Sequence, residues 1–164
     1  MGRTITSGVL SVAGTKVVVL VLGLAASPLL TRLLGDGYGR EAGERLAAHA
    51  RRCTELLLRS EPFHAQRDRI SVRVFAPFAA AAEGKRLCRY GGFGMARYLL
   101  PARPAAAAAI ASRIPADLVV YMVDSSRFGG AGVFNAFATV SAGDRRAGRV
   151  LLHEMGHLLG GLAD

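Results

Sequence analysis

The chain has 164 residues, of which 51% are hydrophobic and 20% are charged, and its formal net charge is +9. This length gives room for one modest domain with its own core, and the composition excludes an intrinsically disordered chain. The basic residues are almost all arginines, and they are scattered along the chain rather than gathered into a run with stacking aromatic side chains. We therefore expect no nucleic-acid partner.

The first thirty residues contain an uncharged apolar stretch that begins at Val17. Lys16 precedes it, and Gly23-Leu24-Ala25 offers the small-x-small pattern of a secretory cleavage site. This pattern favours a signal peptide over residues 1–30, and hence a secreted or extracytoplasmic protein whose apolar segment makes transient contact with a membrane. A buried strand over Lys16–Leu22 is the competing interpretation, since the run is shorter than the roughly 20 residues that span a bilayer.

Next along the chain, the pattern predicts a turn, a helix and a strand. The glycines of Gly35–Gly39 predict the turn, because glycine readily adopts positive φ. Apolar residues at three- and four-residue spacing predict a helix over Glu41–Arg59, which ends before Pro62. The alternation of apolar and polar residues over Ile70–Phe75 predicts a strand with one buried face.

The second half of the chain alternates between helical and extended patterns after residues 79–98, which show no clear period. Pro104 suits the first position of a helix, and a continuous apolar, β-branched run is typical of a buried strand. The predicted elements are a loop at Gly91–Gly94, a helix over Pro104–Arg113, a strand over Leu118–Val123, a turn over Phe128–Gly132, a strand over Phe134–Val140 and a helix over Arg146–Gly160. This order predicts an α/β (α+β) fold, with helices packed on a mixed twisted sheet.

The chain has two cysteines, Cys53 and Cys88, and no C-x-x-C pair. Cysteine therefore cannot build a structural zinc site here. A disulfide in an oxidising compartment and two buried free thiols are both open interpretations.

The last predicted helix carries the sequence His153-Glu154-Met155-Gly156-His157. His153 and His157 share one helix face, so both imidazoles can reach a single Zn²⁺ ion at about 2.0–2.1 Å. Glu154 lies beside that face, where it can take a proton from water instead of binding the metal. The competing interpretation is a pair of core or surface histidines with an incidental glutamate between them.

A catalytic zinc site needs a third protein ligand and leaves a fourth position open for water. Gly160-Gly161 predicts the end of the helix. Three more residues lead to Asp164, and at about 3.3 Å each they cover roughly 10 Å, enough to fold back to the metal. The carboxylate of Asp164 is therefore the candidate third ligand.

Two stretches of the second half resemble the IgA peptidase family of zinc metallo-endopeptidases (metallopeptidase family 64). They are Val123–Ala138, which contains Gly129-Gly130-Ala131-Gly132, and the His153–His157 motif followed by Gly161-Leu162-Ala163-Asp164. Shorter upstream matches, at Gly35-Asp36-Gly37-Tyr38 and Glu61-Pro62-Phe63, extend the resemblance to about residues 33–164.

The resemblance implies a zincin or metzincin-like fold, in which residues 31–164 form the catalytic N-subdomain with the active-site helix at its C-terminal end. It also implies secretion, a Zn²⁺ cofactor and a protein or peptide substrate. In the family the motif continues with Glu and Tyr after the aspartate, and metzincins carry a further C-terminal subdomain. We therefore expect this chain to be truncated after the zinc-binding motif.

Together these patterns predict a zinc-dependent metallo-endopeptidase that hydrolyses peptide bonds by a metal-activated water. We expect the strand over Phe134–Val140 to be the sheet edge on which an extended substrate pairs. The predicted site residues are Glu154 for catalysis, His153, His157 and Asp164 for the metal, and Phe134, Asn135, Ala136 and Phe137 for the substrate. A catalytically incomplete fragment or binding module that retains the zinc helix, and a basic surface-binding protein, are the open alternatives.

Overall fold

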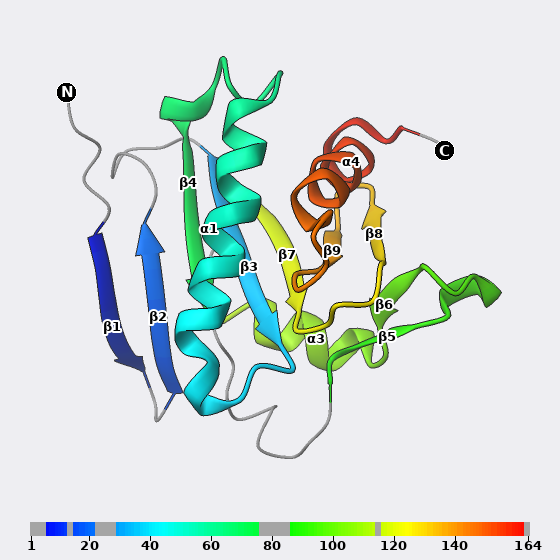
Figure 1. Ribbon diagram of the computed structural model, residues 1–164, viewed down its shortest axis with the longest axis horizontal. Coiled ribbons are helices and arrows are strands. Elements are labelled where there is room, and N and C mark those ends of the chain that lie inside the picture. The colour runs from blue at the N-terminus through cyan, green and yellow to red at the C-terminus, as the bar shows by residue number, and fades with distance from the viewer. Residues whose placement is uncertain (1–5, 13–14, 22–28, 76–85, 114–115, 163–164) are drawn as a thin grey trace.

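A five-stranded mixed sheet forms the centre of the protein in the computed structural model, which describes residues 6–12, 15–21, 29–75, 86–113 and 116–162 (Figure 1). The strand order is β4-β3-β7-β9-β8, in which β8 alone runs antiparallel to its neighbour. These strands are β3 (Leu29–Asp36), β4 (Ile70–Phe75), β7 (Leu118–Val123), β8 (Gly130–Val133) and β9 (Phe137–Ser141). The predicted mixed sheet with packed helices is confirmed.

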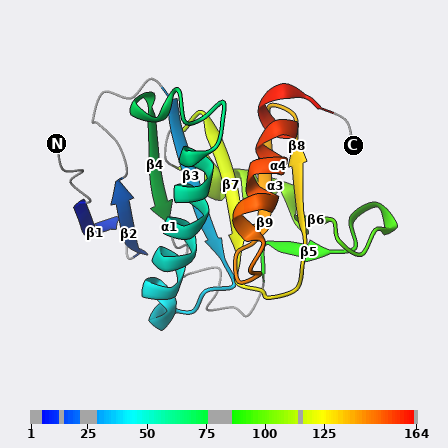
Figure 2. The same ribbon diagram turned by 45° about the horizontal axis from the view of Figure 1, so that its top comes forward.

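Helices cover both faces of this sheet. α1 (Gly43–Arg59) and α4 (Ala147–Gly160) lie side by side on one face, and α3 (Pro104–Ala111) lies on the other (Figures 1 and 2). The remaining elements are two short antiparallel sheets, β1 (Thr6–Val12) with β2 (Thr15–Val21) and β5 (Cys88–Tyr90) with β6 (Leu99–Pro101), and the 3₁₀ turns η1 (Arg40–Ala42), η2 (Arg67–Arg69) and η3 (Gly92–Gly94).

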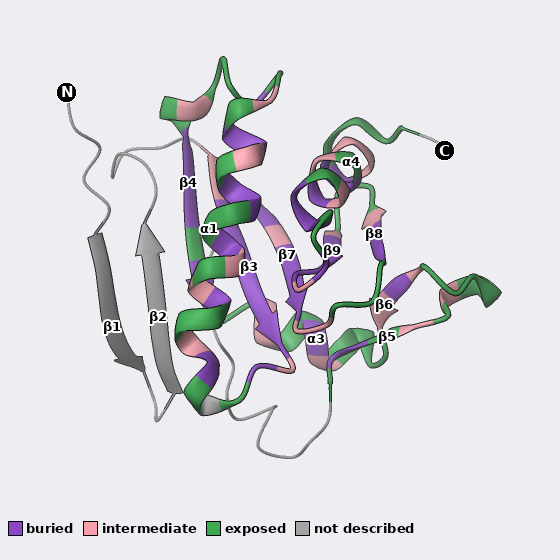
Figure 3. Ribbon diagram, in the orientation of Figure 1, coloured by how far each residue is buried: buried purple, intermediate pink, exposed green. Residues whose placement is uncertain are grey.

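Two hydrophobic clusters lie on the opposite faces of the sheet, because successive side chains of a strand point to opposite sides. On β7, Val120 and Met122 join the cluster under α1 and α4, whereas Tyr121 and Val123 join the cluster on the α3 side. Both faces of the central strands are therefore buried, as Figure 3 shows. The sequence predicted only one buried face for β4. Both of its faces are in fact buried, and Arg73 is the one exposed residue of this strand.

The helices and two of the strands lie where the sequence predicts them. The bounds of β4 and β7 agree with the prediction, and those of α1, α3 and α4 differ from it by at most two residues at each end. The turn predicted at Gly35–Gly39 is wrong in its first half, because β3 continues to Asp36. There β3 pairs with β7, and this pairing between distant segments extends the strand past the glycine.

The sheet edge differs from the prediction. The predicted turn at Phe128–Gly132 contains the start of β8, and the predicted strand at Phe134–Val140 begins only at Phe137, after a turn over residues 134–136. β9 pairs with β7 on one side and with β8 on the other, so β8 is the edge strand. The expectation that Phe134, Asn135, Ala136 and Phe137 belong to an edge strand is therefore wrong.

Cys53 and Cys88 are free and buried, and they lie in different hydrophobic clusters. The sequence left a disulfide and two buried free thiols open, and the structure confirms the free thiols. At the N-terminus, the Lys16–Leu22 segment is strand β2 over most of its length, and residues 22–28 lie outside the described part of the chain. None of the described helices is long and apolar enough to cross a membrane.

Candidate metal centre

Helix α4 is held at both ends and along its buried face. Leu151, Met155 and Leu158 point into the core, at the three- and four-residue spacing of a helix that packs on one side. At its C-terminal end, Gly161 adopts φ 60°, and its N–H donates to the carbonyl of His157 at 3.0 Å. The predicted glycine end of the helix is confirmed, because a left-handed C-terminal residue favours glycine.

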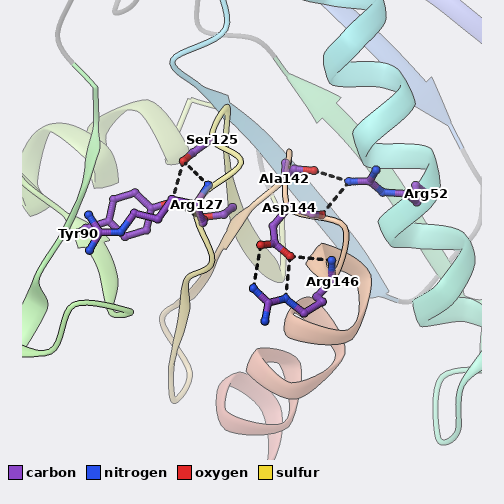
Figure 4. Close-up of polar contacts among 8 residues, drawn as sticks. Arg52, Tyr90, Ser125, Arg127, Ala142, Asp144 and Arg146 are labelled. Atoms are coloured by element: carbon purple, nitrogen blue, oxygen red, sulfur yellow. Dashed lines mark hydrogen bonds and ion pairs between the residues drawn. The ribbon is translucent and has the colours of Figure 1, made fainter.

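The N-terminal end of α4 is anchored through Asp144 (Figure 4). One carboxylate oxygen of Asp144 accepts a hydrogen bond from the backbone N–H of Arg146 at 2.7 Å, and the Arg146 guanidinium pairs with the same carboxylate at 3.1 Å. From α1, Arg52 donates to the carbonyls of Ala142 (2.6 Å) and Asp144 (3.1 Å). These contacts fix the position of α4 against α1.

The loop that leads into β8 is fixed by Tyr90, as Figure 4 also shows. Its hydroxyl lies 2.8 Å from the Arg127 carbonyl and 2.9 Å from the Ser125 hydroxyl, and it also contacts Ser141. The Arg127 guanidinium stacks over the Tyr90 ring at 4.4 Å from its centroid. The edge strand therefore starts from a defined position.

His153 and His157 face one another on α4. Their Nε2 atoms are 3.0 Å apart, and the rings meet edge to face with centroids 4.6 Å apart. Nitrogens this close leave a point that lies about 2.0–2.1 Å from both, the length of a zinc–imidazole bond. The Nδ1 of His157 lies 2.5 Å from the Leu162 carbonyl. A carbonyl only accepts, so Nδ1 carries the proton and the Nε2 lone pair remains for a metal.

The side chain of Glu154 projects from α4 toward the edge strand β8. This side chain is buried, and together with His153 and His157 it forms a group whose ligand atoms all lie within 4.8 Å of one another. Two glycines of β8 make this approach possible. A Cβ on Gly130 would lie 2.9 Å from a Glu154 carboxylate oxygen, and one on Gly132 would lie 2.4 Å from the Glu154 carbonyl oxygen.

A cleft of about 970 Å³ opens over these residues. It is lined by Arg97, Tyr98, Phe128, Gly130, Gly132, Arg146, Arg149, Val150, His153, Glu154, His157 and Leu162. The three arginines make the walls cationic, and Arg146 stacks over the Phe128 ring at 4.2 Å from its centroid. The two imidazole nitrogens that face one point at the wall of this cleft fit a Zn²⁺ ion, and the Glu154 carboxylate lies beside that point, where it can act as an acid–base group.

The predicted site residues separate into three groups. His153, Glu154 and His157 lie together in the cleft, and Asp164 lies outside the described residues. Of the residues predicted to bind substrate, none lines the cleft; Ala136 and Phe137 line a different cavity beside α3. Their part in substrate binding stays a prediction. The sequence did not lead us to predict Gly130 and Gly132 as cleft residues. The signal that could have found them is their spacing, because two glycines two residues apart lie on one face of a strand and often mark the close approach of another backbone.

The sequence was also compared with known proteins. No curated protein sequence matches the chain. A family model described as IgA Peptidase M64 matches residues 21–164. This match covers most of the chain, and it includes the edge strand, the two histidines and Glu154. The chain therefore belongs to the IgA peptidase M64 family.

Proposed function

We propose that this protein is a zinc-dependent endopeptidase that hydrolyses peptide bonds in the cleft between α4 and β8. The observation that carries the proposal is the pair of facing Nε2 atoms of His153 and His157, 3.0 Å apart beside the Glu154 carboxylate. Membership of a peptidase family supports the same reaction class. The zinc helix is also compatible with a binding module that does not hydrolyse its ligand. The test of Glu154 below distinguishes such a module from an enzyme.

A bound zinc ion supplies a Lewis acid that polarises water and the peptide carbonyl. The residues of the chain itself do the rest. His153 and His157 hold the ion, and Asp164 is the proposed third ligand because of its short distance along the chain from Gly161. Glu154 accepts a proton from the attacking water and passes it to the leaving amine. An extended substrate pairs along the open edge of β8 at Gly132, as peptides do when they add a strand to a sheet.

The first prediction concerns the metal. The purified protein should hold about one zinc per chain, and His153→Ala and His157→Ala should each lose it, because two remaining ligands seldom hold zinc. His64→Ala is the matched control, since His64 is exposed, pairs with Glu61 and does not line the cleft. The measurement is elemental analysis after dialysis. Full zinc content in either cleft variant would remove the histidine pair from the proposal.

The second prediction concerns catalysis. Glu154→Gln should keep the zinc but lower the rate of peptide hydrolysis by about 10²–10⁴-fold, because the amide cannot accept the proton from water. The exposed Glu55→Gln serves as control. The assay follows cleavage of an unfolded protein with and without a chelator. If the wild-type protein binds zinc and shows no chelator-sensitive cleavage, it is not a peptidase by itself, and the catalytically incomplete fragment or binding module replaces the proposal.

We also propose that the protein is exported. The support is in the sequence alone, in the apolar stretch from Val17 and the small residues Gly23 and Ala25. In a host with a secretory pathway, the protein should reach the medium or periplasm with a new N-terminus near residue 25. Recovery of the chain only inside the cell, with its first residues intact, would reject export.

A further inference from the structure

A second cavity, on the opposite face of the sheet from α4, contains a buried charge. The cavity has a volume of about 440 Å³, within the range of small-molecule sites, and lies between α3 and strands β7 and β9. Its walls are mostly apolar. They are formed by Arg32, Pro101, Pro104, Ala107, Ala108, Ala111, Ser112, Ala116, Val119, Tyr121, Ala136 and Phe137.

The cavity exists because α3 is built of small side chains. Five consecutive alanines, Ala105 to Ala109, follow Pro104 in this helix. Of the residues of α3, only Ala107 is fully buried against the sheet. Alanine has no side-chain atoms beyond Cβ, so α3 cannot fill the space that larger residues would occupy. Phe137 and Tyr121, whose rings meet edge to face at 5.8 Å, form the wall on the sheet side.

Arg32 brings a positive charge to this apolar space. It belongs to the central strand β3 and is only 1% exposed. Its three guanidinium nitrogens are buried, and none has a hydrogen-bond partner in the part of the chain that the structure describes. The guanidinium lies 5.6 Å from the centre of the Phe75 ring, which compensates the charge only weakly.

A buried guanidinium without hydrogen bonds is expensive, because it loses its hydration and gains no partner. Burial accordingly lowers the pKa of Arg32. The register partner of Arg32 on β4 is Arg73, so a second positive charge lies on the same face of the sheet. Both observations favour an anion as the missing partner.

We propose that this cavity binds a small monocarboxylate with an apolar body, whose carboxylate pairs with Arg32 and whose apolar part fills the space beside α3. A planar carboxylate matches the fork of donors on a guanidinium. A single negative charge balances the one buried positive charge, whereas inorganic phosphate would bring further charge into apolar walls. The site is separate from the zinc cleft, and binding can be measured without peptidase activity.

The test uses the intact protein and three probes: octanoate, octan-1-ol and inorganic phosphate. By calorimetric titration, octanoate should bind with one-to-one stoichiometry. Its affinity should be at least about tenfold higher than that of octan-1-ol, because a hydrogen bond to a charged group contributes that factor to the binding constant. Phosphate should show no binding. Equal affinity for octanoate and octan-1-ol, or no octanoate binding, would overturn the proposal.

Two matched pairs of variants assign the binding to this cavity. Arg32→Met should weaken octanoate binding by about tenfold or more, whereas Arg59→Met, at an exposed position on α1, should not change it. Ala111→Leu should fill the cavity and abolish binding, whereas Ala109→Leu, on the exposed side of α3, should leave it intact. If Arg32→Met does not fold, the alanine pair decides the outcome. Unchanged octanoate binding in Ala111→Leu would reject this location.

Discussion

The charge on Asp144 illustrates how a single residue supports the candidate metal centre without being part of it. Its side chain is only 8% exposed, and it receives hydrogen bonds from both the backbone and the guanidinium of Arg146, at the start of α4. Those bonds hold the pKa of Asp144 below its usual 3.8. At this scale, one carboxylate anchors Arg146, the residue that precedes the first turn of the helix that carries His153 and His157.

Asp144→Asn should reduce stability by about 1 kcal/mol at neutral pH, because it removes the charge from these hydrogen bonds. The folded pKa is lower than the unfolded one, so the carboxylate stabilises the fold fully above the unfolded pKa. That stabilisation is lost as pH falls through the folded pKa. Urea unfolding of both proteins should therefore give a difference at about pH 7 that shrinks as the pH is lowered below the unfolded pKa of the carboxyl group.

Asp68→Asn is the control for this experiment, because the Asp68 side chain is 76% exposed. That variant should leave stability unchanged at neutral pH. A penalty for Asp144→Asn that is equally large at neutral and acid pH would show that the charge is not the source of the stabilisation.

At the scale of elements, the candidate metal centre lies at a contact between one helix and one strand. α4 approaches β8 closely enough that a Cβ on Gly132 would lie 2.4 Å from the Glu154 carbonyl oxygen and 2.7 Å from the His157 Cβ. Both of these atoms belong to rigid parts of the helix, so a side chain at this position displaces α4 itself. The edge strand β8 therefore determines the position of α4 and of the two histidines that it carries.

Gly132→Ala should destabilise the fold by about 1–3 kcal/mol, as insertions into a packed contact do. It should also weaken zinc binding and lower peptidase activity, because the helix that carries the ligands must move. Denaturant unfolding and a metal titration measure the two effects. Gly39→Ala is the matched control, since a Cβ there would meet nothing within 4 Å and Gly39 has φ −70°. Wild-type zinc affinity in Gly132→Ala would contradict the close contact.

Across the whole described molecule, the central sheet separates two hydrophobic clusters that share its strands. Cys53 lies in the cluster under α1, and Cys88 lies in the cluster on the α3 side. Burial raises the pKa of the Cys53 thiol to about 11, and burial together with the nearby Asp36 raises that of Cys88 further. Neither thiol is therefore ionised to any extent near neutral pH, and neither is accessible.

Both thiols should resist a thiol reagent at about pH 8 in the folded protein and react at once in denaturant. Because β3 and β7 contribute side chains to both clusters, the two cysteines should become reactive at the same denaturant concentration. Labelling of Cys53→Ala and Cys88→Ala, each with one remaining thiol, measures the two midpoints. If Cys88 reacts well before global unfolding, the α3 side opens as a separate unit.

The sequence by itself determined the elements whose pattern is local. Apolar spacing was enough for α1 and α4, and a continuous β-branched run was enough for β7, because each depends on the residues of one segment. The pairing of His153 with His157 also follows from one segment, since i and i+4 residues share a helix face wherever the helix lies. The central strand β3 was not predicted, because its apolar residues continue those of the preceding segment and only pairing with β4 and β7 defines its ends.

Only the tertiary structure decided which strand lies at the edge and which charges are buried. The sequence favoured Phe134–Val140 over the glycine-rich Gly130–Val133 as a strand, because glycine has low strand propensity. Yet Gly130 and Gly132 are needed in β8 for the approach of α4, which no local pattern contains. The exposure of Arg32 was equally unpredictable, since an arginine is normally solvated and its burial depends on α3, β4 and β7 meeting around it. Contacts between segments far apart in the chain thus set the shape of the cleft and of the second cavity.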